Sequence, residues 1–426
     1  MLTVVIVFFA LLILGMPVAF AIGISGATFF FTNDVPYSIV VQKVVSGTQS
    51  FTLLAIPLFI FAGNLMNHTG ITSRMIKLSN VLVGHMHGHI GQVSIVMSTL
   101  MGGVSGSANA DAAMESRILG PDMVKRGYSR GWGAAINGLS SLITATIPPS
   151  MGLIIYGSVG EVSIGRLFVA GIVPGIIMAI ALMIAVDVSA KKRNYKPERT
   201  NRASFGEIAK AFADCIWALL FPVILIVGIR FGLMTPSEAG AFAAFYAIIV
   251  GAFIHKELTL KTFIQTLKDS VRDIGVIMLI VAISGIFGYG IVFDRVPQTL
   301  ASLLVGITSS KEIMLLIIIL FLIIAGMFVE TTVCALLLTP ILLPIVTSVG
   351  VDPVHFGVLM MTVVTAGIMT PPVGIALYTV SDIMDCTPEE TVKEAIPFYI
   401  AILAVVLIIA FFPDLILLLP NLVYGS

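Results

Sequence analysis

The sequence predicts an all-α polytopic membrane protein, and three observations support that prediction. Of 426 residues, 58% are hydrophobic and only 11% are charged, whereas soluble domains have about 25% charged residues. Apolar segments recur along the chain, each near the roughly 20 residues that a helix needs to cross a bilayer. Two of these apolar segments are interrupted by Pro-Pro, at Ile147–Gly157 and at Thr370–Tyr378. A water-soluble globular protein is therefore excluded.

Charge and cysteine content exclude further classes. The chain has 23 basic and 23 acidic residues, so it has no net charge with which to bind nucleic acid. Cys215, Cys334 and Cys386 are scattered, without the spacing of a metal or redox site. The apolar N-terminal run lacks the basic region and cleavage site of a signal peptide, so we expect a retained helix.

Membrane spans are expected wherever an apolar run is long enough. Full or nearly full spans are predicted at residues 2–31, 51–67, 130–160, 165–189, 214–233, 235–255, 271–293, 353–384 and 392–420. Two amphipathic stretches, Ile71–Val83 and Leu258–Lys268, are expected to lie along the membrane interface as arm helices, with ordinary loops as the alternative.

Two regions, about 88–125 and 311–349, differ from a simple span. Each has an apolar run, a small or polar tip and a second apolar run. At 1.5 Å per residue, about 10–15 residues reach the midplane of the bilayer, so each run is long enough for half of a hairpin. We therefore predict two re-entrant helical hairpins, with tips at Gly102–Asn109 and Gly326–Thr332.

An internal repeat relates the two halves at an offset of 223 residues, which places Pro148 and Pro149 on Pro371 and Pro372. The same offset matches Pro121 with Pro344, Pro174 with Pro397, Gly103 with Gly326 and Gly127 with Gly350. Because a hairpin precedes a broken helix in both halves, we infer a duplication. The predicted divisions are a first repeat at 1–190 (hairpin about 88–125, broken helix about 130–160), a basic loop and linker helix at 191–234, and a second repeat at 235–426 (hairpin about 311–349, broken helix about 353–384).

The basic loops predict the orientation in the membrane. The connection at 191–202 is rich in Lys and Arg and should face the cytoplasm. Counting spans from this loop places the N-terminus in the cytoplasm and the C-terminus in the periplasm. The first hairpin then enters from the cytoplasm and the second from the opposite side, so the repeats are inverted. The acidic loop Asp385–Glu394 also falls inside, but acidic residues have little weight in this rule.

The interrupted helices predict the position of the functional site. Proline removes a backbone donor and clashes with the preceding turn, so two in succession should unwind a helix. Unpaired backbone inside a membrane is tolerated mainly where it lines a cavity or is buried in protein. A matched pair of breaks, one in each half, is typical of the ion and substrate site of a transporter. Helix kinks without any ligand are the alternative.

The first tip is rich in small and polar residues. Ser105, Ser107 and Asn109 offer hydroxyl and amide oxygens, which together with free carbonyl groups suit Na⁺. The same three residues suit helix capping or close helix packing, and the sequence leaves both interpretations open. The hairpin halves should also present a carbonyl end to cations and an amide end to anions.

Ionisable groups near the tips have open roles. Glu330 of the second tip either joins a proton or sodium relay, or lies at the mouth of the cavity or caps the following helix. Asp111 and Glu115 follow the first tip and face either a wet cavity or a basic partner. We expect at least two sodium ions. Their candidate ligands are Ser105, Ser107, Asn109, Thr146, Pro149, Gly326, Thr331, Thr332, Thr370 and Pro372. The candidate substrate-binding residues are Ser107, Asn109, Ser150, Gly152, Thr331 and Gly374.

Two other patterns suggest different chemistry. His85, His87 and His89 resemble a metal cluster but have no Cys or acidic ligand beside them in the sequence. Gly103–Gly106 matches the GxSG of rhomboid-like intramembrane proteases, in which Ser105 would be the nucleophile. Such an enzyme needs a histidine base on another span, and the six histidines fall near loops or interfaces. An ion channel is the remaining alternative to a transporter.

Four segments together carry a resemblance to a known family. IPLFIFAGNLMN at Ile56–Asn67, SGSANAD at Ser105–Asp111, IPPSMGLIIYG and TPPVGIALY look like the large membrane subunit of a tripartite ATP-independent periplasmic (TRAP) transporter. The similarity covers nearly the whole chain, and the tip motif with the IPP break is its most specific part.

The resemblance implies a sodium-driven secondary transporter of the ion transporter superfamily, not an enzyme, in the bacterial inner membrane. It implies an elevator mechanism, in which a transport domain moves against a scaffold domain, and a substrate that is an organic acid. It also implies two partners, a periplasmic substrate-binding protein and a small four-helix membrane subunit, here expected as a separate chain. The resemblance implies that the family's sodium sites at tips and opposing breaks carry over to Ser105, Ser107, Asn109 and Pro149, and to Gly326, Thr331, Thr370 and Pro372. A sialic acid-like sugar acid and a C4-dicarboxylate both remain open as substrates.

Overall fold

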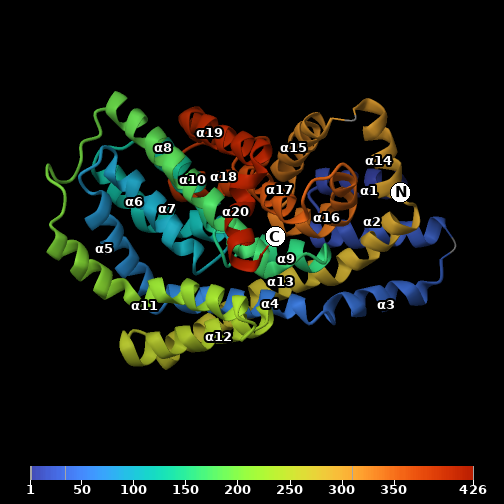
Figure 1. The fold of residues 1–426 in the computed structure, drawn as a ribbon, viewed down its shortest axis with the longest axis horizontal. Helices are drawn as coiled ribbons and strands as arrows, with labels where there is room; N and C mark the ends of the chain where they lie inside the picture. Colours follow the sequence, from blue (N-terminus) through green and yellow to red (C-terminus); the bar gives the residue numbers. More distant parts are fainter. Residues whose placement is uncertain (1, 34, 309, 426) are drawn as a thin grey trace.

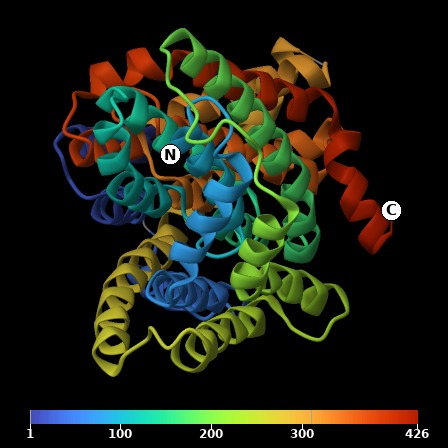
Figure 2. The same cartoon turned by 90° about the vertical axis from the view of Figure 1, so that its left-hand side faces the viewer.

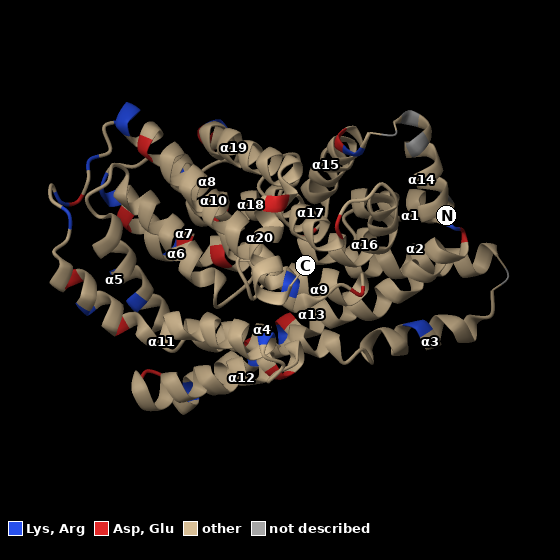
Figure 3. Ribbon diagram, viewed as in Figure 1, with Lys and Arg blue, Asp and Glu red and all other residues tan. Residues whose placement is uncertain are grey.

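The computed structural model describes residues 2–33, 35–308 and 310–425, and no strand occurs among them. Seven described helices are long and apolar enough to cross a membrane, or nine spans if each of two bent helix pairs is counted as one. The prediction of an all-α polytopic membrane protein is confirmed. Figure 3 shows charged residues mainly at helix ends and connections, with Lys and Arg gathered around the connection that follows residue 192.

The helices of the first half run from the N-terminus to the long α10. They are α1 (Leu2–Ile13), α2 (Val18–Thr32), α3 (Tyr37–Thr48), the 3-10 turn η1 (Thr52–Leu54), α4 (Ala55–Asn67), α5 (Ile71–Val83), α6 (His89–Gly102), α7 (Ala108–Lys125), α8 (Arg130–Thr146), α9 (Met151–Val159) and α10 (Ile164–Lys192).

The helices of the second half begin with α11, which follows the basic connection. They are α11 (Phe205–Arg230), α12 (Pro236–Ile249), the π-helical turn η2 (Val250–Ile254), α13 (Leu260–Phe293), α14 (Val296–Ile307), α15 (Lys311–Phe328), α16 (Thr331–Ser348), α17 (Pro353–Gly367), α18 (Ile375–Ile383), α19 (Pro388–Phe411) and α20 (Pro413–Tyr424).

The helices form an elongated layer and a compact body (Figures 1 and 2). In the layer, α4 packs against α12, α2 and α3 pack against α13, and α5 packs against α11. The body contains the helix pairs α6–α7 and α15–α16, the broken helices α8–α9 and α17–α18, and α10, α19 and α20. The layer thus extends along one side of the helices that carry the predicted site.

Local chemistry explains where several helices begin. The side chains of Ser204, Thr235 and Thr387 each accept a hydrogen bond from the backbone of a glutamate three residues later, whose carboxylate accepts from the capping backbone N–H in return. These reciprocal capping boxes satisfy backbone donors that have no partner inside the helix. They define the starts of α11, α12 and α19.

Two predicted spans and one predicted arm helix differ from the observed helices. Residues 2–31 form two helices, because Gly15, with φ +80°, and Pro17 turn the chain between α1 and α2. Leu258–Lys268 is not a separate arm helix, because α13 continues without a break from Leu260 to Phe293. The segment 392–420 is divided between α19 and α20 at Phe412, before Pro413. Helices α3 and α14 had no counterpart among the predicted spans.

Candidate functional site

The first tip packs directly against the first break. Helix α6 ends at Gly102 and α7 begins at Ala108, and the connection includes Gly106 at φ +63°. A Cβ atom on Gly106 would lie 2.1 Å from the carbonyl oxygen of Pro149. Both the left-handed conformation and this close approach require glycine. The tip is therefore held against the unwound segment between α8 and α9, whose axes differ by 43°.

The second tip packs against the second break in the same way. The N–H of Gly374 donates to the carbonyl oxygen of Met327 at 2.9 Å. A Cβ on Gly367 would lie 2.6 Å from the Cα of Gly326, so the end of α17 touches the end of α15 backbone to backbone. In both breaks the Pro-Pro peptide bond is cis.

The two repeats also contact one another reciprocally. Helix α9 of the first repeat packs against α16 of the second, and α18 of the second packs against α7 of the first. Each distal half of a broken helix therefore lies against the hairpin of the other repeat. Such an exchange is the pattern that a two-fold relation between the repeats produces.

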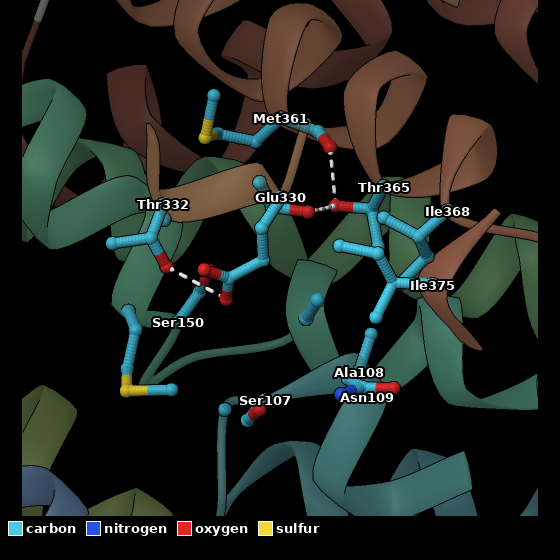
Figure 4. Close-up of a pocket in the computed structure, with 15 residues that line it drawn as sticks. Ser107, Ala108, Asn109, Ser150, Glu330, Thr332, Met361, Thr365, Ile368 and Ile375 are labelled. Carbon is cyan, nitrogen blue, oxygen red and sulfur yellow. Dashed lines mark hydrogen bonds between the residues drawn. The ribbon is translucent and has the colours of Figure 1, made fainter. Parts of the chain in front are cut away.

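Four helix N-termini converge on one cavity between the repeats (Figure 4). The N-terminal residues of α7, α9, α16 and α18 line it, together with side chains from α17. Its volume is about 30 Å³, counted as space for the centres of water-sized molecules, and one water needs about 10–15 Å³ on this measure. In this conformation the cavity accommodates small ions or waters. The lining residues are Gly106, Ser107, Ala108, Asn109, Ala145, Ser150, Met151, Gly152, Glu330, Thr331, Thr332, Met361, Thr365, Ile368 and Ile375.

The electrostatics of this cavity are mixed. Unpaired N–H groups at a helix N-terminus attract anions, and four such ends meet here. The described lining also contains the carboxyl group of Glu330 and no Lys or Arg side chain. Figure 4 shows this carboxyl group between Thr332 and Ser150. Thr332 donates a hydrogen bond from Oγ1 to Glu330 Oε1 at 3.1 Å.

The polar atoms of the first tip are suited to a cation. Ser105 Oγ and Asn109 Oδ1 are buried and have no hydrogen-bond partner in the described part of the chain. Ser107 occupies the N-cap position of α7, but its side chain makes no capping hydrogen bond. These hard oxygen atoms therefore remain available as ligands for a small cation. Ser105 also has no histidine bonded to it, as a protease nucleophile would require.

Some predicted site residues line the cavity, and others lie outside its lining. Those on the lining are Ser107, Asn109, Ser150, Gly152, Thr331, Thr332 and Glu330. Those outside the lining are Ser105, Thr146, Pro149, Gly326, Thr370, Pro372, Gly374 and Asp111. Thr146 and Thr370 donate to carbonyl oxygens of their own helices, four residues earlier. Pro149 is buried against Gly106, whereas Pro372 is exposed.

Ser150 and Glu330 both stand at N-cap positions, but only one of them caps its helix through its side chain. Ser150 caps α9, because its Oγ accepts from the N–H of Leu153 at 3.4 Å. Glu330 stands at the N-cap position of α16 without a side-chain capping bond. Its carboxyl group lines the cavity instead.

Sequence reasoning missed the contribution of α17. Thr365 lines the cavity with Met361, and Thr365 Oγ1 lies 3.5 Å from Thr331 Oγ1 and donates to the Met361 carbonyl oxygen at 2.6 Å. The signal available in the sequence was a pair of threonines, Thr362 and Thr365, within an otherwise apolar helix.

Asp111 and Glu115 face neither a wet cavity nor a basic partner. Both are buried among hydroxyl groups of α6 and α8. Glu115 accepts from Ser94 at 2.5 Å, from Ser98 at 2.8 Å and from Ser140 at 3.1 Å. Thr144 Oγ1 lies 2.5 Å from Asp111 Oδ2. The pair thus forms a buried polar network that joins three helices beside the first tip.

The three histidines of residues 85–89 do not form a metal centre. His87 Nδ1 lies 3.6 Å from Asp187, and His89 Nε2 lies 3.7 Å from Glu198. No group of three or more potential His, Cys, Asp or Glu ligands is found in the part of the chain that the structure describes. His87 and His89 instead lie near separate acidic groups, on α10 and on the connection after it.

Comparison with known proteins agrees with this architecture. The family described as "Tripartite ATP-independent periplasmic transporter, DctM component" matches residues 5–415. The large permease SiaM of a sialic acid TRAP transporter from Vibrio cholerae is 38% identical over 418 residues, covering 97% of each chain. The C4-dicarboxylate TRAP large permease DctM of Rhodobacter capsulatus is 33% identical, again over 97% of each chain.

A solved structure shows the same fold at low sequence identity. The YdaH transporter of Alcanivorax borkumensis superposes with a TM-score of 0.66 at 10% identity, covering 88% of this chain and 87% of that one. This likeness concerns the fold alone, whereas the full-length similarity to the large permeases concerns the family. The chain therefore belongs to the DctM family of large membrane components of TRAP transporters.

Proposed function

We propose that the chain is the large transmembrane subunit of a sodium-coupled secondary transporter that imports an organic acid anion. One observation carries the proposal. Four helix N-termini, which favour an anion, surround a cavity whose lining, among the described residues, has a carboxyl group and no basic side chain. An anionic substrate placed beside Glu330 would be repelled unless cations entered with it. The cost of burying the carboxylate without cations is then the physical origin of coupling.

Sodium binds first in the proposed cycle. Ser105, Ser107 and Asn109 supply oxygen ligands at the first tip, and Thr331 and Thr332 supply them at the second. Bound ions draw the tips towards the breaks and complete an anion site. The substrate carboxylate then meets the N-terminal N–H groups of α7, α9 and α16, with the hydroxyls of Ser107, Ser150 and Thr331 beside them.

Movement of the compact body against the elongated layer completes the proposal. The body would be the transport domain of an elevator mechanism, and the layer would be its scaffold. The hairpins would be re-entrant and inserted from opposite sides, with the N-terminus in the cytoplasm and the C-terminus in the periplasm of a bacterium with an inner membrane. A periplasmic binding protein would deliver the acid, and a small membrane subunit would complete the transporter.

The relatives limit the substrate class without selecting one acid. One is named for sialic acid and another for C4-dicarboxylates. Both substrates carry carboxylates, and both suit a site formed by helix N-termini. We infer an organic acid of one of these two kinds.

The test replaces the oxygen ligands of the first tip. Asn109→Leu and Ser105→Leu should abolish sodium-driven uptake of labelled sialic acid and labelled succinate into proteoliposomes that contain the small subunit, with the binding protein added outside. Both variants should still insert into the membrane. Thr347→Leu, at an exposed position on α16, is the matched control and should transport normally. Unaltered sodium-driven uptake in the Asn109 and Ser105 variants would contradict the site. Conductance without saturable uptake would favour a channel.

A further inference from the structure

A second and larger cavity lies beside the central one, along α7. It has a volume of about 650 Å³ on the same measure, against about 30 Å³ for the central cavity. Asn109 at the start of α7 lines the central cavity, and Ala110, the next residue, lines the larger one. The opposite wall comes from the end of α4 and the start of α5, in the elongated layer. The first tip therefore separates a narrow central cavity from a wide vestibule.

One face of α7 forms the wall of this vestibule. Ala110, Ala113, Met114 and Arg117 line it, at the three- and four-residue spacing that places side chains on one helical face. The small side chains near the tip leave room for a solute. Arg117 lies nine residues beyond the start of α7, or about 14 Å along its axis. It also lines a third cavity, of about 530 Å³, which continues towards Lys125 and Arg130 at the base of the hairpin.

The charges around the vestibule leave Arg117 unneutralised. Glu257, the acidic residue in its lining, pairs with Arg74 at 2.8 Å. In the third cavity, Arg130 is likewise paired with Asp385. Arg117 is exposed and has no hydrogen bond or ion pair within residues 2–33, 35–308 and 310–425. Its guanidinium group is free to receive a ligand.

The chemistry of this group matches that of a carboxylate. A guanidinium presents a planar fork of donors that binds a carboxylate through two parallel hydrogen bonds. The vestibule also contains Thr72, 7% exposed, whose Oγ1 has no partner among the described residues. An arginine that only anchored a helix at the membrane surface would face lipid headgroups. Arg117 instead lines a cavity whose lining also includes Thr72 and Ser73 of α5.

We propose that Arg117 is a docking residue for the substrate carboxylate on the release route from the central cavity. The inference rests on the proposed function, which places the base of the first hairpin at the cytoplasm. Because no basic side chain in the described part of the chain lines the central cavity, Arg117 is the first cationic group that an acid leaving the tip would meet along α7. It would lower the barrier to release by accepting the carboxylate as the helix N-termini give it up.

The first test of this role measures how Arg117 changes the labelling of a thiol in the vestibule, and it needs no transported substrate. In a Cys386→Ser background, Ser73→Cys places a thiol in the vestibule wall opposite α7. The measurement compares the rates at which an anionic and a cationic methanethiosulfonate reagent label this thiol. The ratio of the anionic to the cationic rate should be higher when Arg117 is present than when it is absent. Arg117→Gln should lower this ratio of labelling rates by about threefold or more, and Arg117→Lys should largely restore it. Lys268→Gln, an exposed lysine on α13 that lines neither cavity, should have no effect.

The second test measures release in exchange experiments with proteoliposomes, using labelled sialic acid and labelled succinate. Arg117→Gln should raise the internal concentration of the transported acid at half-maximal exchange by about tenfold. The sodium concentration at half-maximal rate should stay the same. An unchanged ratio of labelling rates in Arg117→Gln would overturn the inference whatever the transport result. Failure of the wild type to couple uptake to sodium would instead contradict the proposed function, and the labelling experiment would still stand.

Discussion

The two hairpins share a backbone plan but differ in what they bury. In the first, Asp111 and Glu115 are buried with four hydroxyl groups, from Ser94, Ser98, Ser140 and Thr144. At the offset of 223 residues, the second repeat has Cys334 and Leu338 in place of the two acids. The four hydroxyl positions are taken by Ile317, Phe321, Val363 and Gly367. Acceptors and donors are thus present together in one repeat and absent together in the other.

This difference follows from the cost of a partly satisfied network. A buried carboxyl group without donors loses its hydration and gains nothing in return, and a buried hydroxyl without an acceptor is also destabilising. A polar network is therefore retained whole or replaced whole by apolar side chains. The duplicated fold is compatible with either a buried polar network or apolar packing at these positions. The first repeat is specialised for polar contacts next to its tip, and the second for apolar packing.

The breaks differ as well. Pro148 and Pro149 are buried, and the first tip covers them, whereas Pro371 and Pro372 are exposed. The first tip needs a glycine at position 106, while the aligned residue in the second repeat is Val329. The first break is therefore the more deeply buried of the two, and its fit to the first tip depends on a glycine that the second tip lacks.

The largest expected effect comes from disturbing that fit. Gly106→Ala would force a Cβ to within 2.1 Å of the Pro149 carbonyl oxygen in a left-handed backbone conformation. We expect sodium-driven uptake to fall by at least about tenfold, because tip and break separate. Gly350→Ala is the matched control, since Gly350 also has positive φ but open space around it. Equal effects of the two substitutions on uptake would show that close packing at the first tip is unimportant.

A smaller effect is expected when one member of the network is removed. Glu115→Leu copies the second repeat at one position and removes the carboxylate that accepts hydrogen bonds from three serine hydroxyls. The loss should be about 1–3 kcal/mol, seen as a lower unfolding temperature of the detergent-purified protein. Glu115→Gln keeps one acceptor oxygen and should lose less, and Leu338→Met serves as the control in the other repeat. A Glu115→Leu variant as stable as the wild type would indicate that the network does not act as a unit.

The smallest effect concerns α10 and α19, the helices that follow the two broken helices. Helix α19 begins with a capping box between Thr387 and Glu390, whereas α10 begins with Ser163 alone. Thr387→Ala should cost about 1 kcal/mol and Ser163→Ala less, because only the first breaks a reciprocal pair of hydrogen bonds. Thermal unfolding of the two variants side by side measures the difference. The opposite order of stabilities would contradict this account of the helix starts.

The sequence predicted the features that proline, glycine and chain length determine. The tips and breaks could be located because Pro148, Pro149 and their partners cannot continue a helix. The division of residues 2–31 was missed, although Gly15 and Pro17 signal a turn, because the apolar run on both sides has the length of a span. The continuity of α13 was missed because its first turns are amphipathic and its later ones apolar.

Contacts between distant segments could not be predicted from one sequence. The partners of Glu115 lie 17 to 25 residues away on α6 and α8, and no local pattern relates them. The same holds for Thr365, which reaches the cavity only because α17 packs beside the second tip. The vestibule beside Arg117 depends on where α5 is placed relative to α7, which is likewise a property of the tertiary structure.

The most direct test of the account is equilibrium binding of radioactive ²²Na⁺ to the purified protein in detergent. Because oxygen ligands from both tips are proposed to hold the ions, the wild type should bind sodium saturably. The double variant Asn109→Leu/Thr331→Val should lose that binding while it keeps its helical content. Saturable sodium binding of unchanged affinity and stoichiometry in the double variant would contradict the central claim.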